Sequence, residues 1–395
     1  MENSIFDEII NRTETGSIKH DFYQMYGKPA GLIPLWVADM DFRSPPEVID
    51  ALKRHADGSV FGYTYARPEY FDVQRQWFSS RFGWNPVAKW NQPIPGVMFG
   101  VAATIRALTQ EGEAVLIQQP VYYPFQEIIV SNRRELVVNE LLQDADGRYK
   151  VNWDDFERKI LQKNVKIFLL CSPHNPVARV WTEAELRKMG EICLHYGVRI
   201  ISDEIHADFP LFGTRQILFP TLSEELAENC ILCTSPSKTF NLMGLQTANL
   251  WVSNADLREK IIAECQRFFW FGISAPALEA STAAYRFGGE WLDELRQYLE
   301  GNVRYVADRL EAMRSEIRIT PHEGTYLMWL DCRAWGKKDA ELDSFFTHEA
   351  GLWLNQGATF GVGGSGFMRL NVATSRNVLT SAMNQLESAL QKTRR

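Results

Sequence analysis

Residues 165–204 have the sequence VKIFLLCSPHNPVARVWTEAELRKMGEICLHYGVRIISDE and predict a strand, a helix and a second strand. The two apolar runs, 165–171 and 198–202, have the length of buried strands. Between them, Thr182 and Glu185 match a capping box, apolar residues recur with helical spacing, and a glycine suits the helix end. A strand–helix–strand unit of this kind places its strands parallel and covers the sheet with the helix.

The same alternation continues on both sides of this unit. Strands are predicted at 114–118 and at 230–234, so the fold class is α/β with a mostly parallel central sheet flanked by helices. The two ends differ: the first 45 residues are rich in turn formers, and long amphipathic segments near the C-terminus flank strand-like runs. We therefore expect a large domain at 46–288 and a smaller α+β domain made of 1–45 and 289–395.

Composition excludes several classes of protein. The chain has 395 residues, 45% of them hydrophobic and 23% charged, which suits a globular protein of about two domains at ~100–200 residues each. Its net charge is −7 and it has no basic run, so no nucleic-acid partner is expected. An acidic N-terminus and the absence of a run of ~18–20 apolar residues predict no signal peptide, no membrane partner and a cytoplasmic location.

The six cysteines are scattered, as expected for reduced thiols. Cys230 and Cys233 form a C-x-x-C pattern inside an apolar, strand-like run, and we interpret them as two buried structural residues rather than a redox or zinc site.

Lys238 is the only charged residue between Glu228 and Asp256. A lysine in neutral surroundings loses solvation, which disfavours its charged form and makes its amine nucleophilic. The ordinary interpretation is a loop lysine whose ammonium reaches water. Ser235 and Ser237 favour a site, because their hydroxyls can donate to phosphate oxygens and follow a predicted strand, where open α/β sheets bind ligands.

Residues at the ends of other predicted strands could bind the same ligand. Asp203 ends one strand and needs a cation or donors, Asn175 follows another, and Tyr122 follows a third with a ring that could stack on a planar ligand. The backbone of Val97 and Met98 opens a helix after glycine and offers N–H groups to a phosphate. Caps, turns and core packing explain each feature singly, but together they describe a site for a phosphorylated aromatic aldehyde. That is the chemistry of pyridoxal 5′-phosphate, or PLP.

These motifs resemble fold type I PLP enzymes of the class I/II aminotransferase superfamily. The finer motifs are similar to the bacterial cystathionine β-lyase / cystalysin branch of C–S lyases, and the resemblance covers nearly the whole chain. The motifs that carry it are 34–42 (PLWVADMDF), 61–64 (FGYT), 120–125 (PVYYPF), 172–176 (SPHNP), 202–206 (SDEIH), 235–241 (SPSKTFN), 324–327 (GTYL) and 369–371 (RLN).

The resemblance implies a role for each cofactor-binding residue. Lys238 would bind the cofactor aldehyde covalently and later act as the acid and base, and Asp203 would pair with the pyridine nitrogen. Asn175 would bind the ring 3-oxygen, and Tyr122 would stack on the ring. The phosphate would be held by Ser235, Ser237, the Val97 and Met98 backbone, and Tyr63 from the partner subunit of a homodimer.

The resemblance also implies which residues bind the substrate. Arg369 would bind the α-carboxylate of an amino-acid substrate as a bidentate fork, helped by the Trp36 and Val37 backbone and by Asn175. Tyr123 would lie beside the leaving group and assist its departure. His206 would support the cofactor site rather than carry protons.

Three departures from the family pattern stand out. Gln246 occupies the position eight residues after the lysine where typical aminotransferases have a phosphate-binding arginine, which favours the β-lyase branch. Ala178 stands where the branch usually has glycine, so a positive φ would strain it. The aromatic segment 268–271 either lines the entrance or packs a helix against the sheet, and we favour packing.

The resulting hypothesis is a C–S β-lyase that cleaves cystathionine or other S-substituted cysteines to a thiol, pyruvate and ammonia. An aminotransferase on the same scaffold is the alternative, because both reactions share their first steps. A non-catalytic regulatory protein that keeps the fold is a third, and it would gain support if Lys238→Ala kept the whole biological effect. The preferred substrate stays open.

Overall fold

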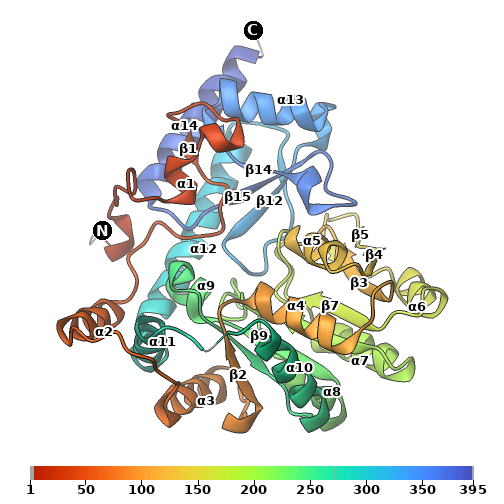
Figure 1. Ribbon diagram of the computed structural model, residues 1–395. Coiled ribbons are helices and arrows are strands. Elements are labelled where there is room, and N and C mark those ends of the chain that lie inside the picture. Colours follow the sequence, from red (N-terminus) through yellow and green to blue (C-terminus); the bar gives the residue numbers. More distant parts are fainter. Residues whose placement is uncertain (1–3, 271, 394–395) are drawn as a thin grey trace.

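The computed structural model describes residues 4–270 and 272–393, and a seven-stranded sheet forms the centre of its larger part (Figure 1). The strand order is β2-β10-β9-β8-β7-β3-β4; β10 runs antiparallel to both neighbours and the other pairings are parallel. The predicted mostly parallel sheet is confirmed. Its strands are β2 (Asn91–Ile94), β3 (Ala114–Gln119), β4 (Glu135–Glu140), β7 (Ile167–Cys171), β8 (Arg199–Asp203), β9 (Cys230–Thr234) and β10 (Ala248–Trp251).

Helices cover both faces of this sheet because its strands are apolar on both sides. In β7, Ile167 and Leu169 join one buried cluster, while Phe168 and Leu170 join the other. The first face is covered by α4 (Val97–Leu108), α5 (Pro124–Ser131) and α10 (Ala255–Arg267). The second is covered by α6 (Trp153–Gln162), α7 (Glu183–His195) and α8 (Glu224–Glu228).

The strand–helix–strand unit forms as the sequence predicts. Thr182 Oγ1 accepts from the Glu185 amide at 3.3 Å, and the Glu185 carboxylate accepts from the Thr182 amide at 2.9 Å, which completes the capping box of α7. The helix ends just before Gly197, whose φ of 68° is left-handed.

A smaller antiparallel sheet lies in the upper part of Figure 1. Its order is β11 (Arg318–Ile319), β12 (Leu327–Asp331), β15 (Phe367–Asn371) and β14 (Asn355–Gln356), with helices α12 (Gly289–Ala312), α13 (Asp339–Ser344) and α14 (Arg376–Thr393). The N-terminal segment joins this part, because β1 (Ile33–Pro34) pairs with β13 (Leu352–Trp353) in parallel. The exact domain boundaries stay a prediction.

The remaining elements lie outside these two sheets. Helix α11 (Ala275–Phe287) packs on α2 (Pro46–Asp57) and α3 (Pro68–Phe82). The others are the short helices α1 (Ile18–Asp21) and α9 (Pro236–Phe240), the hairpin of β5 (Leu142–Gln143) and β6 (Tyr149–Lys150), and the π-helix η7 (Phe345–Glu349). The 3₁₀ helices are η1 (Ile5–Asp7), η2 (Gln24–Tyr26), η3 (Ala88–Trp90), η4 (Phe219–Thr221), η5 (Met243–Leu245), η6 (Arg333–Trp335) and η8 (Gly357–Phe360).

Two features of the described residues bear on the composition argument. None of their helices is both long and apolar enough to cross a membrane. Cys230 and Cys233 are buried within β9, as predicted, and burial raises the pKa of both thiols, which keeps them protonated and unreactive.

Candidate active site

A cavity of about 620 Å³ opens where β7, β8 and β9 end and α4 and α9 begin. This is the edge at which open α/β sheets bind ligands. The cavity brings together most of the predicted site residues, namely Val97, Met98, Tyr122, Asn175, Asp203, His206, Ser235, Ser237 and Lys238.

Lys238 projects from α9 into this cavity. Its Nζ donates to the Ala38 carbonyl at 2.5 Å, and the Tyr326 hydroxyl donates to the same oxygen at 3.0 Å. Burial lowers the pKa of Lys238 to about 8; the charge of Arg369 lowers it further, and Asp39 and Asp203 oppose both effects. The amine is therefore partly neutral near pH 8, as a nucleophile or base must be.

Asp203 ends β8 with little compensation for its charge. Its Oδ1 accepts from the Ile205 amide at 3.1 Å, and burial raises its pKa to about 7 because that amide and the Lys238 charge offset desolvation only in part. A buried carboxylate with so few partners suits a cationic ring nitrogen placed beside it.

His206 lines the same cavity as a neutral ring. Burial lowers its pKa well below the usual value, and the charges of Lys238 and Arg369 lower it further. Its Nδ1 has no hydrogen-bond partner, and its ring lies 5.6 Å from the Tyr326 ring. A neutral, buried imidazole agrees with a supporting role, which stays a prediction.

The start of α4 offers free amides. Gly96 precedes the helix without a side-chain cap, so the Val97 and Met98 amides have no partner within the helix. Apart from its own chain neighbours, no described residue has an atom within 4 Å of where a Gly96 Cβ would stand. Unpaired amides and open space beside them suit a phosphate group.

Hydroxyl groups lie beside this helix start. Ser235 Oγ lies 2.8 Å from Ser237 Oγ and donates to the Thr247 carbonyl at 2.6 Å. Gln246 also lines the cavity. Among the described residues, Lys238 is the only lysine or arginine in the lining, so any phosphate here would be held mainly by neutral donors.

Arg369 lies on β15 and is buried without a carboxylate partner among the described residues. Its Nη1 donates to Asn175 Oδ1 at 3.0 Å, and its Nη2 donates at 2.7 Å both to the Trp36 carbonyl and to Asn355 Oδ1. Burial lowers its pKa to about 10, and three nearby tyrosines oppose that shift. A buried guanidinium without a counter-ion favours binding of an anion.

The three predicted tyrosines have different surroundings. The Tyr122 amide donates to the Asn175 carbonyl at 3.1 Å, and burial raises the pKa of Tyr122 to about 12. Tyr123 is half-buried, its ring is 6.0 Å from Phe360, and burial raises its pKa while the charge of Arg369 opposes the shift. Tyr63 is fully exposed and lies outside the cavity lining of its own chain.

Residues 36–42, here called the strap, pass beside the cavity, which Ala38 lines, and contain the predicted Trp36 and Val37, which lie outside the cavity lining. The strap has no regular secondary structure, and side chains from other elements hold its carbonyl groups. Besides the bonds to Trp36 and Ala38, these are Asn371 to Val37 at 2.7 Å and to Asp39 at 2.6 Å, and Asn241 to Met40 at 3.0 Å and to Phe42 at 2.8 Å.

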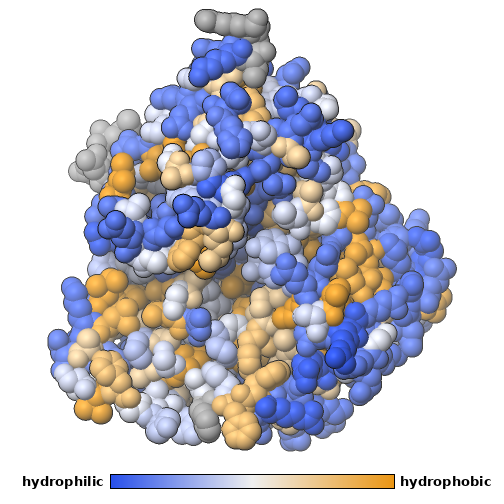
Figure 2. All heavy atoms as spheres, turned by 45° about the horizontal axis from the view of Figure 1, so that its top comes forward, coloured by the Kyte–Doolittle hydropathy of each residue, from blue (hydrophilic) through white to orange (hydrophobic). Residues whose placement is uncertain are grey.

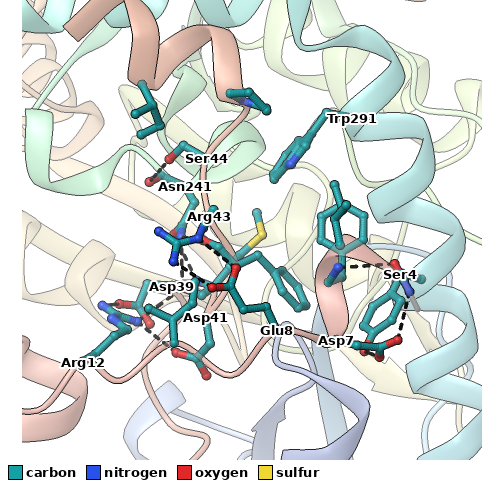
Figure 3. A pocket seen from close by; sticks show the side chains of 18 of the residues that line it. Ser4, Asp7, Glu8, Arg12, Asp39, Asp41, Arg43, Ser44, Asn241 and Trp291 are labelled. Atoms are coloured by element: carbon teal, nitrogen blue, oxygen red, sulfur yellow. Dashed lines mark hydrogen bonds and ion pairs between the residues drawn. The ribbon is translucent and has the colours of Figure 1, made fainter. Parts of the chain in front are cut away.

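The other side of the strap borders a larger groove of about 1590 Å³ (Figure 3). There Arg12 bonds to Asp39 at 2.7 Å and to Asp41 at 2.9 Å. Lys19 is fully buried and lies 2.8 Å from Asp41. Burial would raise the pKa of Asp41, but the charge of Lys19 and hydrogen bonds from His20 and Lys19 outweigh it and hold this pKa well below its usual range.

Two of the noted departures can be placed. Ala178 has φ of 57°, so it adopts the left-handed backbone that strains alanine more than glycine. In the aromatic segment, Phe268 packs on Phe99 at 5.3 Å and Phe269 is 82% exposed, so this segment lies beside the first turn of α4 and not inside the core. Phe271 lies outside the described residues.

Four residues of the site were not assigned by sequence reasoning. Tyr326 and Asn371 lie within the motifs at 324–327 and 369–371, so the motifs could have indicated them. Ala38 acts through its carbonyl, which no side chain pattern reveals. Asn355 lies in a short strand without any motif, and only its pairing opposite Arg369 brings it to the site.

Comparisons with known proteins place the chain in a family. The chain matches the aminotransferase class I and II family model over residues 30–386. The cystathionine beta-lyase PatB of Bacillus subtilis (strain 168) is 38% identical over 98% of this chain and 99% of its own. A PLP-bound candidate aminotransferase from Clostridium difficile 630 has a TM-score of 0.95 at 37% identity, covering 98% of this chain and 100% of that one. Cystalysin from Treponema denticola, which contains PLP, has a TM-score of 0.93 at 35% identity over 98% and 99%.

Proposed function

Since the chain belongs to the aminotransferase class I and II family, we propose that it is a PLP-dependent carbon–sulfur β-lyase. It cleaves L-cystathionine or related S-substituted cysteines to a thiol, pyruvate and ammonia. Relatives named cystathionine beta-lyase, at 33–38% identity over nearly their whole length, support this activity. The observation that carries it is the cavity that holds the buried amine of Lys238 together with Asn175, whose Oδ1 accepts from the buried guanidinium of Arg369 beside the cavity.

The cavity fits PLP by its donor set. Free amides at Val97 and Met98 and the hydroxyl of Ser237 suit the phosphate, and the Ser235 hydroxyl joins them by turning its single hydrogen away from the Thr247 carbonyl. The under-compensated Asp203 suits the ring nitrogen. Asn175 uses its Oδ1 for Arg369, which leaves its amide N–H groups for the ring oxygen. Bound PLP supplies an electron sink for the electron pair left at the substrate's Cα.

Three residues of the chain carry out the remaining steps of the reaction. Arg369 binds the substrate's α-carboxylate and fixes the orientation of Cα. Lys238, whose pKa near 8 keeps part of it neutral, removes the Cα proton. The Cβ–S bond then breaks, the sulfur leaves as a thiolate, and the hydroxyl of Tyr123, a half-buried residue, gives it a proton. Water consumes the remaining three-carbon fragment, which yields pyruvate and ammonia.

The test is pyruvate formation from L-cystathionine by the purified holoenzyme without any added 2-oxo acid. A coupled lactate dehydrogenase assay measures pyruvate, and a thiol reagent measures the second product in equal amount. L-Alanine is the matched control, because it has the same α-carbon but no leaving group and should give no pyruvate. Turnover that appears only after a 2-oxo acid acceptor is added would support the aminotransferase alternative instead.

The working unit is a homodimer in which Tyr63 reaches the phosphate of the partner subunit's cofactor. The segment around Tyr63 supports this, because Val60, Phe61, Tyr63 and Tyr65 are each at least 68% exposed. Figure 2 shows apolar patches on the lower half of one face, which belongs to the large-sheet part. Exposed aromatic side chains gathered in one loop are typical of an interface.

A further inference from the structure

Three of the five N–H donors of Arg369 are occupied before any substrate binds. Both Nη2 hydrogens are taken, one by the Trp36 carbonyl and one by Asn355 Oδ1, and one Nη1 hydrogen is taken by Asn175. The buried Nε has no partner. Phe360 covers a face of the guanidinium at 4.9 Å, so an incoming ligand must approach in the plane of the group.

A carboxylate that binds both of its oxygens to a guanidinium needs two parallel N–H groups on one edge. The planar group has two such edges, Nε with Nη2 and Nη1 with Nη2, and Nη2 belongs to both. A bidentate substrate carboxylate therefore must displace either the Trp36 carbonyl or Asn355 from Nη2. The unpartnered Nε favours the Nε/Nη2 edge, because its N–H is already available.

The two partners of Nη2 differ in how easily they can leave. The Trp36 carbonyl belongs to the strap, whose neighbouring carbonyls are bound by Asn371 and Tyr326. Asn355 contributes only a half-buried side-chain amide, and its backbone stays paired with β15 when that amide rotates. Because a guanidinium has no acceptor, the amide must present its oxygen to Arg369, in the position a carboxylate oxygen would take.

We propose that Asn355 is a placeholder on Arg369, and that the substrate's α-carboxylate replaces its amide oxygen on Nη2 while the other carboxylate oxygen binds Nε. Asn355 is thus a positioning residue that keeps the buried guanidinium oriented until the anion arrives. The inference rests on the proposed function, which assigns the α-carboxylate to Arg369. It predicts that the anion competes with Asn355 rather than adding to it.

The test uses propionate, a carboxylate without an amino group that cannot react with the cofactor, titrated into the PLP-loaded protein by saturation-transfer NMR. Asn355→Asp places an internal carboxylate on Arg369, and we expect propionate to bind at least about tenfold more weakly. The melting temperature of this variant should rise, because the buried arginine gains a counter-ion. Gln356→Glu is the matched control: it adds the same charge at the next residue, on the opposite face of the strand, and should change neither measurement.

Asn355→Ala separates a placeholder from a required donor. Loss of a competitor should leave propionate affinity within about threefold of wild type, or improve it, because the freed N–H can still bind the anion. A loss as large as that of Arg369→Met would overturn the inference, as would unchanged binding by Asn355→Asp or no binding by wild type. If wild type makes no pyruvate from cystathionine but the propionate results hold, the proposed function fails while the role of Asn355 stands.

Discussion

Replacing Lys19 by methionine should destabilise the protein by about 3 kcal/mol at pH 7. The Lys19 side chain is fully buried, and its ammonium lies 2.8 Å from Asp41 and 3.5 Å from Asp39. Breaking a buried ion pair typically costs about 3–5 kcal/mol, because the partner charge stays behind uncompensated. Arg12 still contacts both carboxylates after the change, which places the expected loss at the lower end of that range.

The loss should depend on pH with a defined sign. Lys19 helps hold the pKa of Asp41 below its usual range, so ionised Asp41 stabilises the folded state at any pH above the unfolded-state value of about 3.9. This contribution fades as the pH falls below about 3.9 towards the lower folded-state pKa. The difference between wild type and Lys19→Met should therefore be full at pH 7 and shrink below pH 4.

Urea unfolding at fixed protein concentration and saturating PLP measures both effects. Lys53→Met is the matched control, because Lys53 makes only an exposed pair with Asp50 at 3.8 Å and should change stability by less than about 1 kcal/mol. If Lys19→Met costs no more than this control, or costs the same at pH 3 as at pH 7, the argument that a buried ion cluster anchors the strap is wrong.

Three further outcomes follow from the site and its surroundings. Ala178→Gly should stabilise the protein by about 0.5–1 kcal/mol in urea unfolding, because a left-handed backbone costs alanine more than glycine; a loss of stability would contradict this. Tyr326→Phe removes the hydroxyl that donates to the Ala38 carbonyl, and it should raise KM several-fold without releasing PLP. An unchanged KM in steady-state assays would show that the strap does not need this hydrogen bond. Inactive Lys238→Ala and Tyr63→Phe subunits, mixed in equal amounts, should recover up to about a quarter of wild-type activity. Random pairing makes half of the dimers hybrid, and each hybrid has one intact site out of two. No recovery of activity would argue against a site shared between subunits.

The parallel sheet and the cofactor cavity could be predicted because their signals are local. Apolar runs of strand length, a capping box and polar residues at strand ends lie within a few residues of one another. Once parallel strands are assumed, their carboxyl ends meet at one edge, so Asp203, Asn175 and Lys238 had to converge. The site roles of these residues rest on that convergence and stay proposals.

The resemblance implied that the Trp36 and Val37 backbone lies near Arg369, but the other contacts of the strap could not be predicted, because they join distant parts of the chain. Lys238 and Ala38 are 200 residues apart, and the bond uses a backbone carbonyl that every residue possesses. The pairing of Asn355 opposite Arg369 depends on the register of a two-residue strand, which is too short to leave a periodic pattern. Tyr63 illustrates the reverse case: its motif was visible, but its expected place lies on another subunit.

The strap also has a consequence for changing this enzyme by design. Its residue Ala38 lines the cofactor cavity, whereas the following residues 39–42 line the larger groove. Substitutions that line only the groove can shift the carbonyl groups that hold Lys238 and Arg369 without placing any new atom near the substrate. Libraries directed at the groove are therefore a route to altered turnover that replaces no side chain lining the cofactor cavity.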